Sequence, residues 1–212
     1  LRTPRTVLGG ISEELREGGE PAGLVDTLDR QISRLRTFAQ DLEELDAIES
    51  GRIGLEMADI EAKDVVGQAL DDLRAKAEAA GVTLHAVCDD VCLVTDPVRL
   101  SQVLTNLIDN GIRYNRPGGR VTVSVQQVQE GVRFEVVDDG IGIPAEELPL
   151  VFQRFYRVRR GRQAEGGSGL GLAIVKHLVH ALGGTVQLSS VEGTGTTVTL
   201  TLPSGTPSRV QR

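Results

Sequence analysis

The chain has 212 residues, 40% of them hydrophobic, which is enough for a core in one large or two smaller domains. A net charge of −7 argues against a general nucleic-acid-binding protein, and no signal peptide or apolar run of about 20 residues indicates a membrane span. Cys88 and Cys92 have no second cysteine pair and no histidine cluster near them, so we expect neither a disulfide framework nor a zinc site.

Residues 1–55 predict a helical hairpin. Leucines recur at seven-residue spacing on both sides of a short break, REGGEP. They are Leu1, Leu8 and Leu15 before the break and Leu28, Leu35 and Leu42 after it. Two such helices pack as an antiparallel hairpin with a coiled-coil seam. The seam is wider than one helix covers, so we expect a homodimer in which two hairpins form a four-helix bundle. A helical cap on the next domain is the alternative.

Residues 56–203 predict an α+β domain, with residues 204–212 as a tail. The stretch ESGRIGLEMADIEAKD is interpreted as a connector. Helices are expected over 61–80, over 97–114 and in LGLAIVKHLVHALGG, and strands in VTLHAV, GRVTVSVQQV, VRFEVVD, TVQLSSV and TTVTLTL. Strands paired as hairpins with helices between them favour a two-layer α/β sandwich over a parallel wound sheet.

The helix predicted over 97–114 carries a polar stripe beside its apolar face. Arg99, Gln102, Asn106, Asn110 and Arg113 fall on this stripe. Asparagine is a weak helix former, so two asparagines four residues apart indicate a role other than helicity. Amide oxygens are hard, neutral ligands suited to Mg²⁺, and the flanking arginines are suited to phosphate. An ordinary solvated helix face is the alternative.

Two glycine-containing stretches follow. In VVDDGIGIP, an apolar strand ends in Asp138, and Gly140 and Gly142 come next. A carboxylate in an apolar pocket accepts a hydrogen bond from the amine of adenine, and the glycines would let the backbone approach a flat ring. A plain Asp-Gly turn is the alternative.

The second stretch, GGSGLGL at 166–172, opens a helix, and the N–H groups of a glycine-rich helix start bind anions. Leu172 stands where a Walker loop requires lysine. A charged segment, RRGRQAEGG, precedes the glycines where a dinucleotide fingerprint requires a strand, so neither of these motifs fits.

The segment VFQRFYRVRRGRQAE lies between the two glycine stretches. It holds three of the chain's six aromatic residues and five arginines, four of which follow the last aromatic residue. An aromatic anchor followed by a polar, glycine-containing stretch predicts a mobile lid over a phosphate site. A solvated basic loop would leave the aromatic cluster without a reason.

Five motifs occur in a fixed order within residues 102–203: NLIDNGIRYN, DDGIGIP, VFQRFYR, GGSGLGLAIVK and GTGTTVTLTLP. They resemble the asparagine box, first glycine box, phenylalanine box, second glycine box and closing strand of the sensor histidine kinases of two-component systems. The resemblance implies the histidine kinase/gyrase-type ATP-binding fold.

LRTP also resembles the end of the family's H-E-L-R-T-P phosphoacceptor box, and DLEELDAIESGRIGLE resembles the end of its second dimerisation helix. On this basis the phosphoacceptor histidine is expected just before Leu1, and the chain is expected to be a fragment. His85, His177 and His180 lack the context of the box.

The resemblance implies ATP and Mg²⁺ as cofactors, with Asn110 as the Mg²⁺ ligand and Asn106 assisting. It implies that Thr3 orients a water that dephosphorylates the partner. The other catalytic roles fall to Asn106, Arg113 and Arg157. The implied nucleotide-binding residues are Asn106, Asn110, Arg113, Tyr114, Asp138, Gly140, Gly142, Ile143, Tyr156, Arg157, Gly167, Ser168, Gly169, Leu170 and Gly171.

The predicted function is that of an ATP- and Mg²⁺-dependent protein histidine kinase core. It would pass the γ-phosphate to a histidine and then to an aspartate of a response regulator receiver domain, with a hinge near residues 50–60. The expected partners are ATP, the receiver domain and a second copy, and not nucleic acid. The expected location is cytoplasmic, with any membrane contact made by parts of the parent protein outside this chain. This chain alone is not expected to autophosphorylate.

Two other functions are weighed. One is a dimeric module that binds nucleotide without transferring phosphate. The other is an ATPase like the gyrase, mismatch-repair and heat-shock chaperone families, which carry a glutamate where Asn106 stands. An amide does not act as a general base, which disfavours the ATPase.

Overall fold

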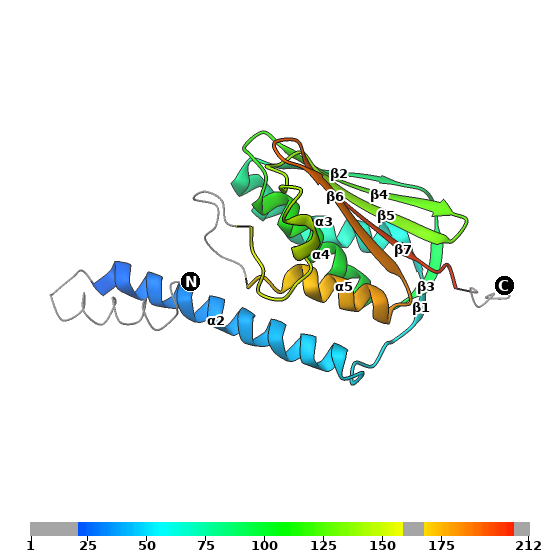
Figure 1. Ribbon diagram of the computed structural model, residues 1–212, viewed down its shortest axis with the longest axis horizontal. Coiled ribbons are helices and arrows are strands. Elements are labelled where there is room, and N and C mark those ends of the chain that lie inside the picture. Colours follow the sequence, from blue (N-terminus) through cyan, green and yellow to red (C-terminus); the bar gives the residue numbers. More distant parts are fainter. Residues whose placement is uncertain (1–20, 159–167, 206–212) are drawn as a thin grey trace.

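The computed structural model of the chain describes residues 21–158 and 168–205. The predicted first helix of the hairpin, Thr3, Gly167 and most of the predicted tail lie outside this part (Figure 1). The described helices are α2 (Pro21–Glu49), α3 (Ala62–Ala80), α4 (Pro97–Arg113), the short 3-10 helix η1 (Leu148–Leu150) and α5 (Gly171–Ala181). The described strands are β1 (Ala58–Glu61), β2 (Thr83–Cys88), β3 (Cys92–Thr95), β4 (Arg120–Val128), β5 (Gly131–Asp138), β6 (Thr185–Val191) and β7 (Gly195–Leu202).

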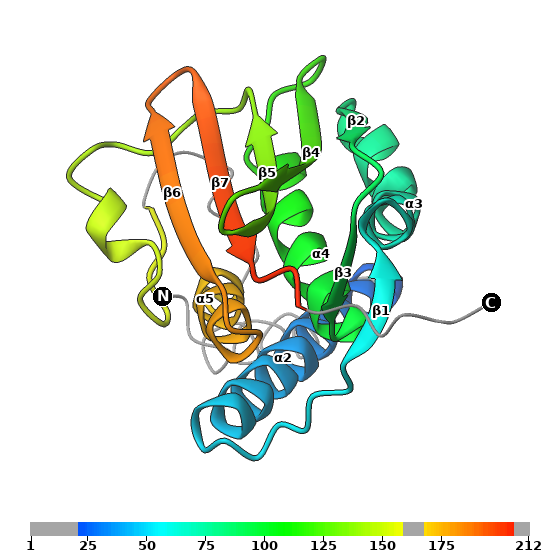
Figure 2. The ribbon, with the colours of Figure 1, turned by 90° about the vertical axis from the view of Figure 1, so that its right-hand side faces the viewer.

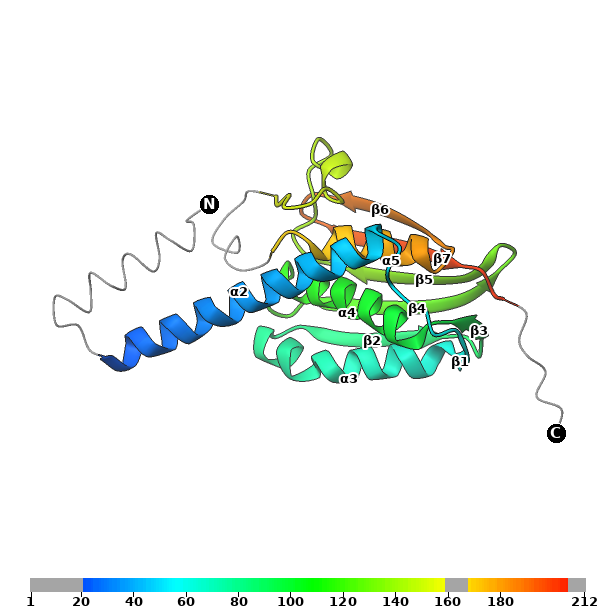
Figure 3. The ribbon, with the colours of Figure 1, turned by 90° about the horizontal axis from the view of Figure 1, so that it is seen from below.

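The main sheet has five strands in the order β2-β4-β5-β7-β6. Alternate residues of its central strands are buried, as in Val121, Val123 and Val125 of β4, because one face of the sheet packs on helices. Helices α3, α4 and α5 lie side by side on that face (Figures 2 and 3). This confirms the predicted two-layer α/β sandwich.

Strand pairing is mixed, whereas the sequence predicted hairpins. β4–β5 and β6–β7 are antiparallel hairpins, but β2 pairs with β4 in parallel, with Thr83 opposite Arg120. Parallel neighbours need a crossover connection, and α4 lies within the segment that joins β2 to β4. The parallel pair therefore arises because α4 stands between the two strands in the chain.

The structure contains a small second sheet that the sequence did not predict. The stretch interpreted as a connector contains β1, which pairs antiparallel with β3, with Ala58 opposite Thr95. Each strand has four residues, too few to show a two-residue periodicity, which is why the prediction of a connector was wrong at this point. The pairing anchors the chain between α2 and α3 beside the start of α4.

Helix α4 begins at a well-formed N-cap. Oδ1 of Asp96 accepts hydrogen bonds from the N–H groups of Val98 (2.9 Å) and Arg99 (3.0 Å), and Pro97 occupies the first turn. Oδ2 of Asp96 accepts a third from the N–H of Glu56 at 2.9 Å, so the cap also fixes the segment before β1. This accounts for the burial of an acidic side chain that is only 3% exposed.

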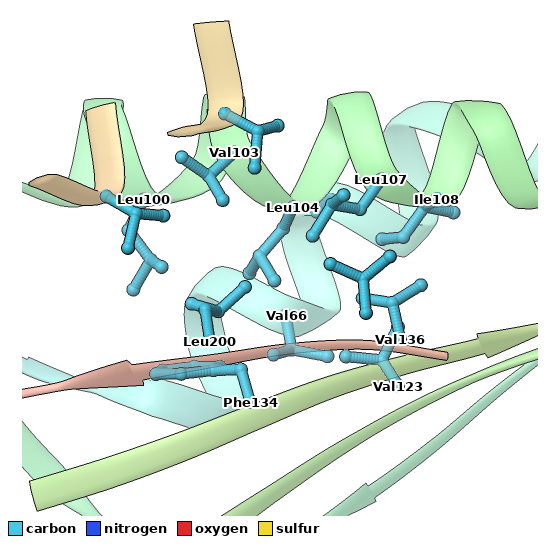
Figure 4. Close-up of a cluster of buried hydrophobic side chains, with 14 of the residues drawn as sticks. Val66, Leu100, Val103, Leu104, Leu107, Ile108, Val123, Phe134, Val136 and Leu200 are labelled. Carbon is cyan, nitrogen blue, oxygen red and sulfur yellow. The ribbon is translucent and has the colours of Figure 1, made fainter. Parts of the chain in front are cut away.

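The apolar face of α4 forms the centre of the core. Leu100, Val103, Leu104, Leu107 and Ile108 are buried, and they point towards the sheet (Figure 4). They meet side chains from three strands and from α3, namely Val123 of β4, Phe134 and Val136 of β5, Leu200 of β7 and Val66 of α3. The residues that the sequence placed on the apolar face of this helix are therefore buried.

Helix α2 extends past the sandwich, and its C-terminal part lies along α5 (Figures 1 and 3). Leu45 and Ile48 of α2 are buried in the same core cluster as the sandwich. Leu35 and Leu42, from the seven-residue row, are exposed. A dimer interface on that row stays a prediction.

None of the helices in residues 21–158 and 168–205 combines the length and apolarity needed to cross a membrane.

Replacing Phe134 by alanine is expected to lower the free energy of unfolding by about 3–5 kcal/mol, because the ring is fully buried and its removal leaves a cavity. Val137, on the same strand but 38% exposed, supplies the control: Val137→Ala is expected to cost less than about 1 kcal/mol. Urea unfolding of both variants measures the difference. Equal losses would contradict the packing described for β5.

Candidate functional site

A cavity of about 270 Å³ lies between α4, the ends of β5 and β7 and the loop before α5. The predicted site residues that line it are Asn106, Asn110, Arg113, Tyr114, Asp138, Gly142, Ile143, Tyr156, Arg157, Ser168, Gly169 and Gly171. Gly140 and Leu170 do not line it, and Thr3 and Gly167 lie outside the described residues. The structure therefore brings together side chains from segments more than 60 residues apart.

The polar stripe of α4 divides into two parts. Asn106, Asn110 and Arg113 face the cavity. Arg99 instead donates to Oε1 of Glu44 on α2 at 2.8 Å, and Gln102 donates to Oε2 of the same carboxylate at 2.5 Å. A phosphate role for Arg99 is therefore wrong, because the first turns of α4 face α2 rather than the cavity.

Asp138 ends β5 at one wall of the cavity. Its Oδ1 accepts hydrogen bonds from the N–H groups of Gly140 (2.9 Å) and Thr196 (3.2 Å). No donor among the described residues binds Oδ2. Burial, which disfavours the charged carboxylate, raises the pKa of Asp138 to about 6, against the opposing effect of the two N–H donors. The side chain is thus a desolvated acceptor with one oxygen available to a ligand.

The glycines after Asp138 make close contacts within the protein itself. A Cβ on Gly140 would lie 2.4 Å from the carbonyl oxygen of Tyr114, and one on Gly142, whose φ is +66°, would lie 2.1 Å from that of Val191. Both contacts are with the protein's own backbone. These glycines allow the loop to pack against the end of α4 and the β6–β7 turn. Their predicted role beside a flat ring stays a prediction.

The loop before α5 places a helix N-terminus at the other end of the cavity. The first N–H groups of a helix have no partner within the helix, and they favour an anion. A Cβ on Gly171 would lie 3.5 Å from Oδ1 of Asn106, so the start of α5 lies beside the asparagine stripe. Leu170 itself is buried in the core, which explains its absence from the cavity wall.

The base of the predicted lid is described up to residue 158. The hydroxyl of Tyr156 donates to Oε2 of Glu147 at 2.8 Å. The N–H of Phe155 donates to the carbonyl of Gly169 at 2.9 Å, although Phe155 has a φ of +64°, which is unusual for a bulky residue. The Phe155 contact holds the start of the segment against the glycine loop, and the Tyr156 contact holds it against the residue before η1. Closure of a lid stays a prediction, because residues 159–167 lie outside the described part.

Four polar residues of the cavity were not predicted from the sequence. Thr37 and Asp41 reach it from α2, which was predicted as part of a separate hairpin. Asp109, which forms an ion pair with Lys76, and Thr196 also line it. Nothing in the sequence of α2 indicates which of its faces packs against the cavity. Thr196, in contrast, lies in the closing-strand motif, so its position next to Asp138 was predictable.

The donors present fit a Mg²⁺ ion that is held largely by phosphate. Within the described residues, histidine, cysteine, aspartate and glutamate side chains form no cluster of three or more that would hold a metal. Asn106 and Asn110 supply amide oxygens on consecutive turns of α4. Mg²⁺ commonly takes few protein ligands and completes its shell with water and substrate phosphates, so two amides suffice.

Residues 95–206 match the model of the histidine kinase-, DNA gyrase B- and HSP90-like ATPase family. The chain belongs to this family. It is 39% identical over 209 residues to the sensor protein DivL of Caulobacter vibrioides and 35% identical over 213 residues to the sensor histidine kinase WalK of Bacillus subtilis. Each alignment covers 96% of this chain but only 26% and 35% of those proteins, respectively, so the chain spans about a third or less of their length.

The structure is similar to that of the Acinetobacter baumannii histidine kinase AdeS, with a TM-score of 0.81, 27% identity and 97% of each chain covered. The chain is therefore a sensor histidine kinase catalytic domain with an adjoining helix, as its motifs indicated.

The raised pKa of Asp138 predicts a pH-dependent stability. The folded chain holds the proton more tightly than an ordinary carboxyl with a pKa of 3.8, so the favourable contribution of the protonated form is full below about pH 4. It is lost as the pH rises through about 6, a change of up to about 3 kcal/mol.

Asp138→Asn keeps the acceptor oxygen but carries no charge, so its stability relative to the unsubstituted chain is expected to be greater at pH 7.5 than at pH 4.5. Urea unfolding at both pH values measures this difference. If the difference in free energy of unfolding between the two proteins did not change with pH, the burial of a charged carboxylate at this position would be contradicted.

Proposed function

We propose that this chain binds ATP with Mg²⁺ and places the γ-phosphate for transfer to a histidine. The main observation behind the proposal is that the two ends of the cavity offer different chemical groups. At one end, Asp138 offers a desolvated acceptor to the amine of adenine. At the other end, the asparagine stripe and the N-terminus of α5 offer neutral ligands and N–H donors to a metal-bound triphosphate.

The two ends lie beside different turns of α4. A Cβ on Gly111 would lie 3.5 Å from Cβ of Asp138, whereas Asn106 lies beside Gly171. Five residues of an α-helix span about 7.5 Å along its axis. The adenine end and the phosphate end are therefore more than one helical turn apart on the same helix.

The side chains of the cavity favour transfer to an external acceptor over hydrolysis. Asn106 is neutral and does not activate water, unlike the glutamate of the related ATPases. The described carboxylates of the cavity are otherwise engaged: Asp109 pairs with Lys76, Asp41 binds Ser168, and Asp138 lies at the adenine end. Phosphoryl transfer needs placement and charge neutralisation rather than covalent help, and Arg113 and Arg157 line the cavity as cations.

We place the acceptor histidine on the hairpin of the whole protein, in a box of which LRTP is the end. None of the chain's three histidines lines the cavity. From the acceptor, the phosphoryl group would pass to an aspartate of a response regulator receiver domain. The exposed leucine row of α2, with Leu35 and Leu42, is the proposed homodimer face.

A transfer assay in trans tests this proposal. The chain is mixed with labelled ATP, Mg²⁺ and a separate hairpin polypeptide in which a histidine and an acidic residue precede LRTP. Label that is acid-labile and alkali-stable is expected on the hairpin only when Mg²⁺ is present. Asp138→Asn is expected to lower the labelling more than about tenfold, because an amide NH2, which donates, replaces Oδ2, the oxygen proposed to accept from adenine.

Asp139→Asn is the matched control, since it makes the same chemical change one residue away, on a side chain that does not line the cavity. Its labelling is expected to stay within about twofold of the unsubstituted chain. ATP binding without any label would favour the non-transferring module, and no ATP binding would contradict the proposal.

A further inference from the structure

Helix α2 reaches into the phosphate end of the cavity. Thr37 and Asp41 line the same cavity as Asn106 and Gly171, although α2 lies about 60 residues or more away in the sequence. The hydroxyl of Ser168, in the loop before α5, donates a hydrogen bond to Oδ2 of Asp41 at 2.7 Å. A carboxylate from α2 therefore occupies a donor of the loop that is proposed to hold phosphate.

The single proton of the Ser168 hydroxyl is already used in this arrangement. It accepts a hydrogen bond from the N–H of Leu170 at 3.1 Å while it donates to Asp41. A serine hydroxyl has one proton to donate. A phosphate oxygen can receive that proton only if Asp41 gives it up, so the carboxylate and a phosphate compete for one donor.

The charge of Asp41 opposes a phosphate at the same place. The described ion pairs of α2 are made by Glu44, Asp46 and Glu49, and Asp41 is not among them. Two like charges a few ångströms apart near a protein surface repel by on the order of 1 kcal/mol or more, and salt weakens the repulsion. The repulsion grows with each negative charge on the phosphate chain.

A second contact of α2 lies next to the first. The rings of Phe38 on α2 and Phe155 at the base of the lid lie 5.9 Å apart between centroids, and the N–H of Phe155 donates to Gly169. Phe38 and Asp41 are three residues apart, so they share one face of the helix. The lid base and the glycine loop are thus both held by the same face of α2.

We propose that Asp41 is a specificity-determining residue that tunes the affinity of the cavity for the terminal phosphate of a nucleoside triphosphate. The inference rests on the proposed ATP site. The carboxylate holds Ser168, and the triphosphate displaces it through competition for the hydroxyl and through charge repulsion. Binding of the triphosphate therefore loosens the contact between α2 and the loop before α5, whereas a nucleoside without phosphates leaves it in place.

Asp41→Asn tests this inference, because it removes the charge at constant size. Binding of ATP with Mg²⁺, measured by calorimetry, is expected to become about three- to tenfold tighter. Binding of adenosine is expected to change less than about twofold, since it has no charge to repel. Raising NaCl from about 50 to about 500 mM is expected to reduce the gain for ATP.

Glu43→Gln is the matched control. Glu43 is an exposed carboxylate two residues from Asp41, and it lines a surface groove rather than the cavity. Its removal is expected to leave both affinities unchanged. Ser168→Ala supplies a second test, because the gain from Asp41→Asn is expected to be smaller when the shared hydroxyl is absent.

Weaker ATP binding by Asp41→Asn would overturn the inference, because it would show that the carboxylate supports ATP binding instead of opposing it. The same ATP affinity in Asp41→Asn and Glu43→Gln would also overturn it, while leaving the ATP site itself intact. If neither the unsubstituted chain nor Asp41→Asn bound ATP or adenosine, the proposed function would fail and this inference with it.

Discussion

The packing of α4 against the sheet is the constraint on which the rest of the structure depends. Its apolar face is buried on β4, β5 and β7, and Asp96 fixes both its start and the segment that leads to β1. Once that face is buried, helical periodicity turns Asn106 and Asn110 towards the cavity. The core and the candidate site are therefore two sides of one helix, and a shift of α4 would move both.

The sequence predicted the long elements well because their periodicity is strong. Helices α3 and α4, the β4–β5 and β6–β7 hairpins and the sandwich were all foreseen. The sheet of β1 and β3 was missed because each strand has four residues. The parallel pairing of β2 was missed because periodicity reports which face is buried and not which strand is the neighbour.

The site residues that belong to a sequence motif were predictable. Those that reach the cavity only because α2 packs against the rest of the fold were not. Asp138, the asparagines and the loop before α5 line one cavity, as the motif order suggested. Asp41 and Thr37 were missed, because nothing in a helix's own sequence tells which surface of a distant segment it meets. The close contacts of Gly140 and Gly142 with the backbone of Tyr114 and Val191 were not foreseen either.

The direction in which a nucleotide lies in the cavity is the central claim. The most direct measurement is a crystal structure of the chain with Mg²⁺ and a non-hydrolysable ATP analogue. The account predicts the adenine amine within hydrogen-bonding distance of Asp138, and the phosphates and metal between Asn106, Asn110 and the start of α5. A nucleotide bound in the opposite direction, or outside this cavity, would contradict it.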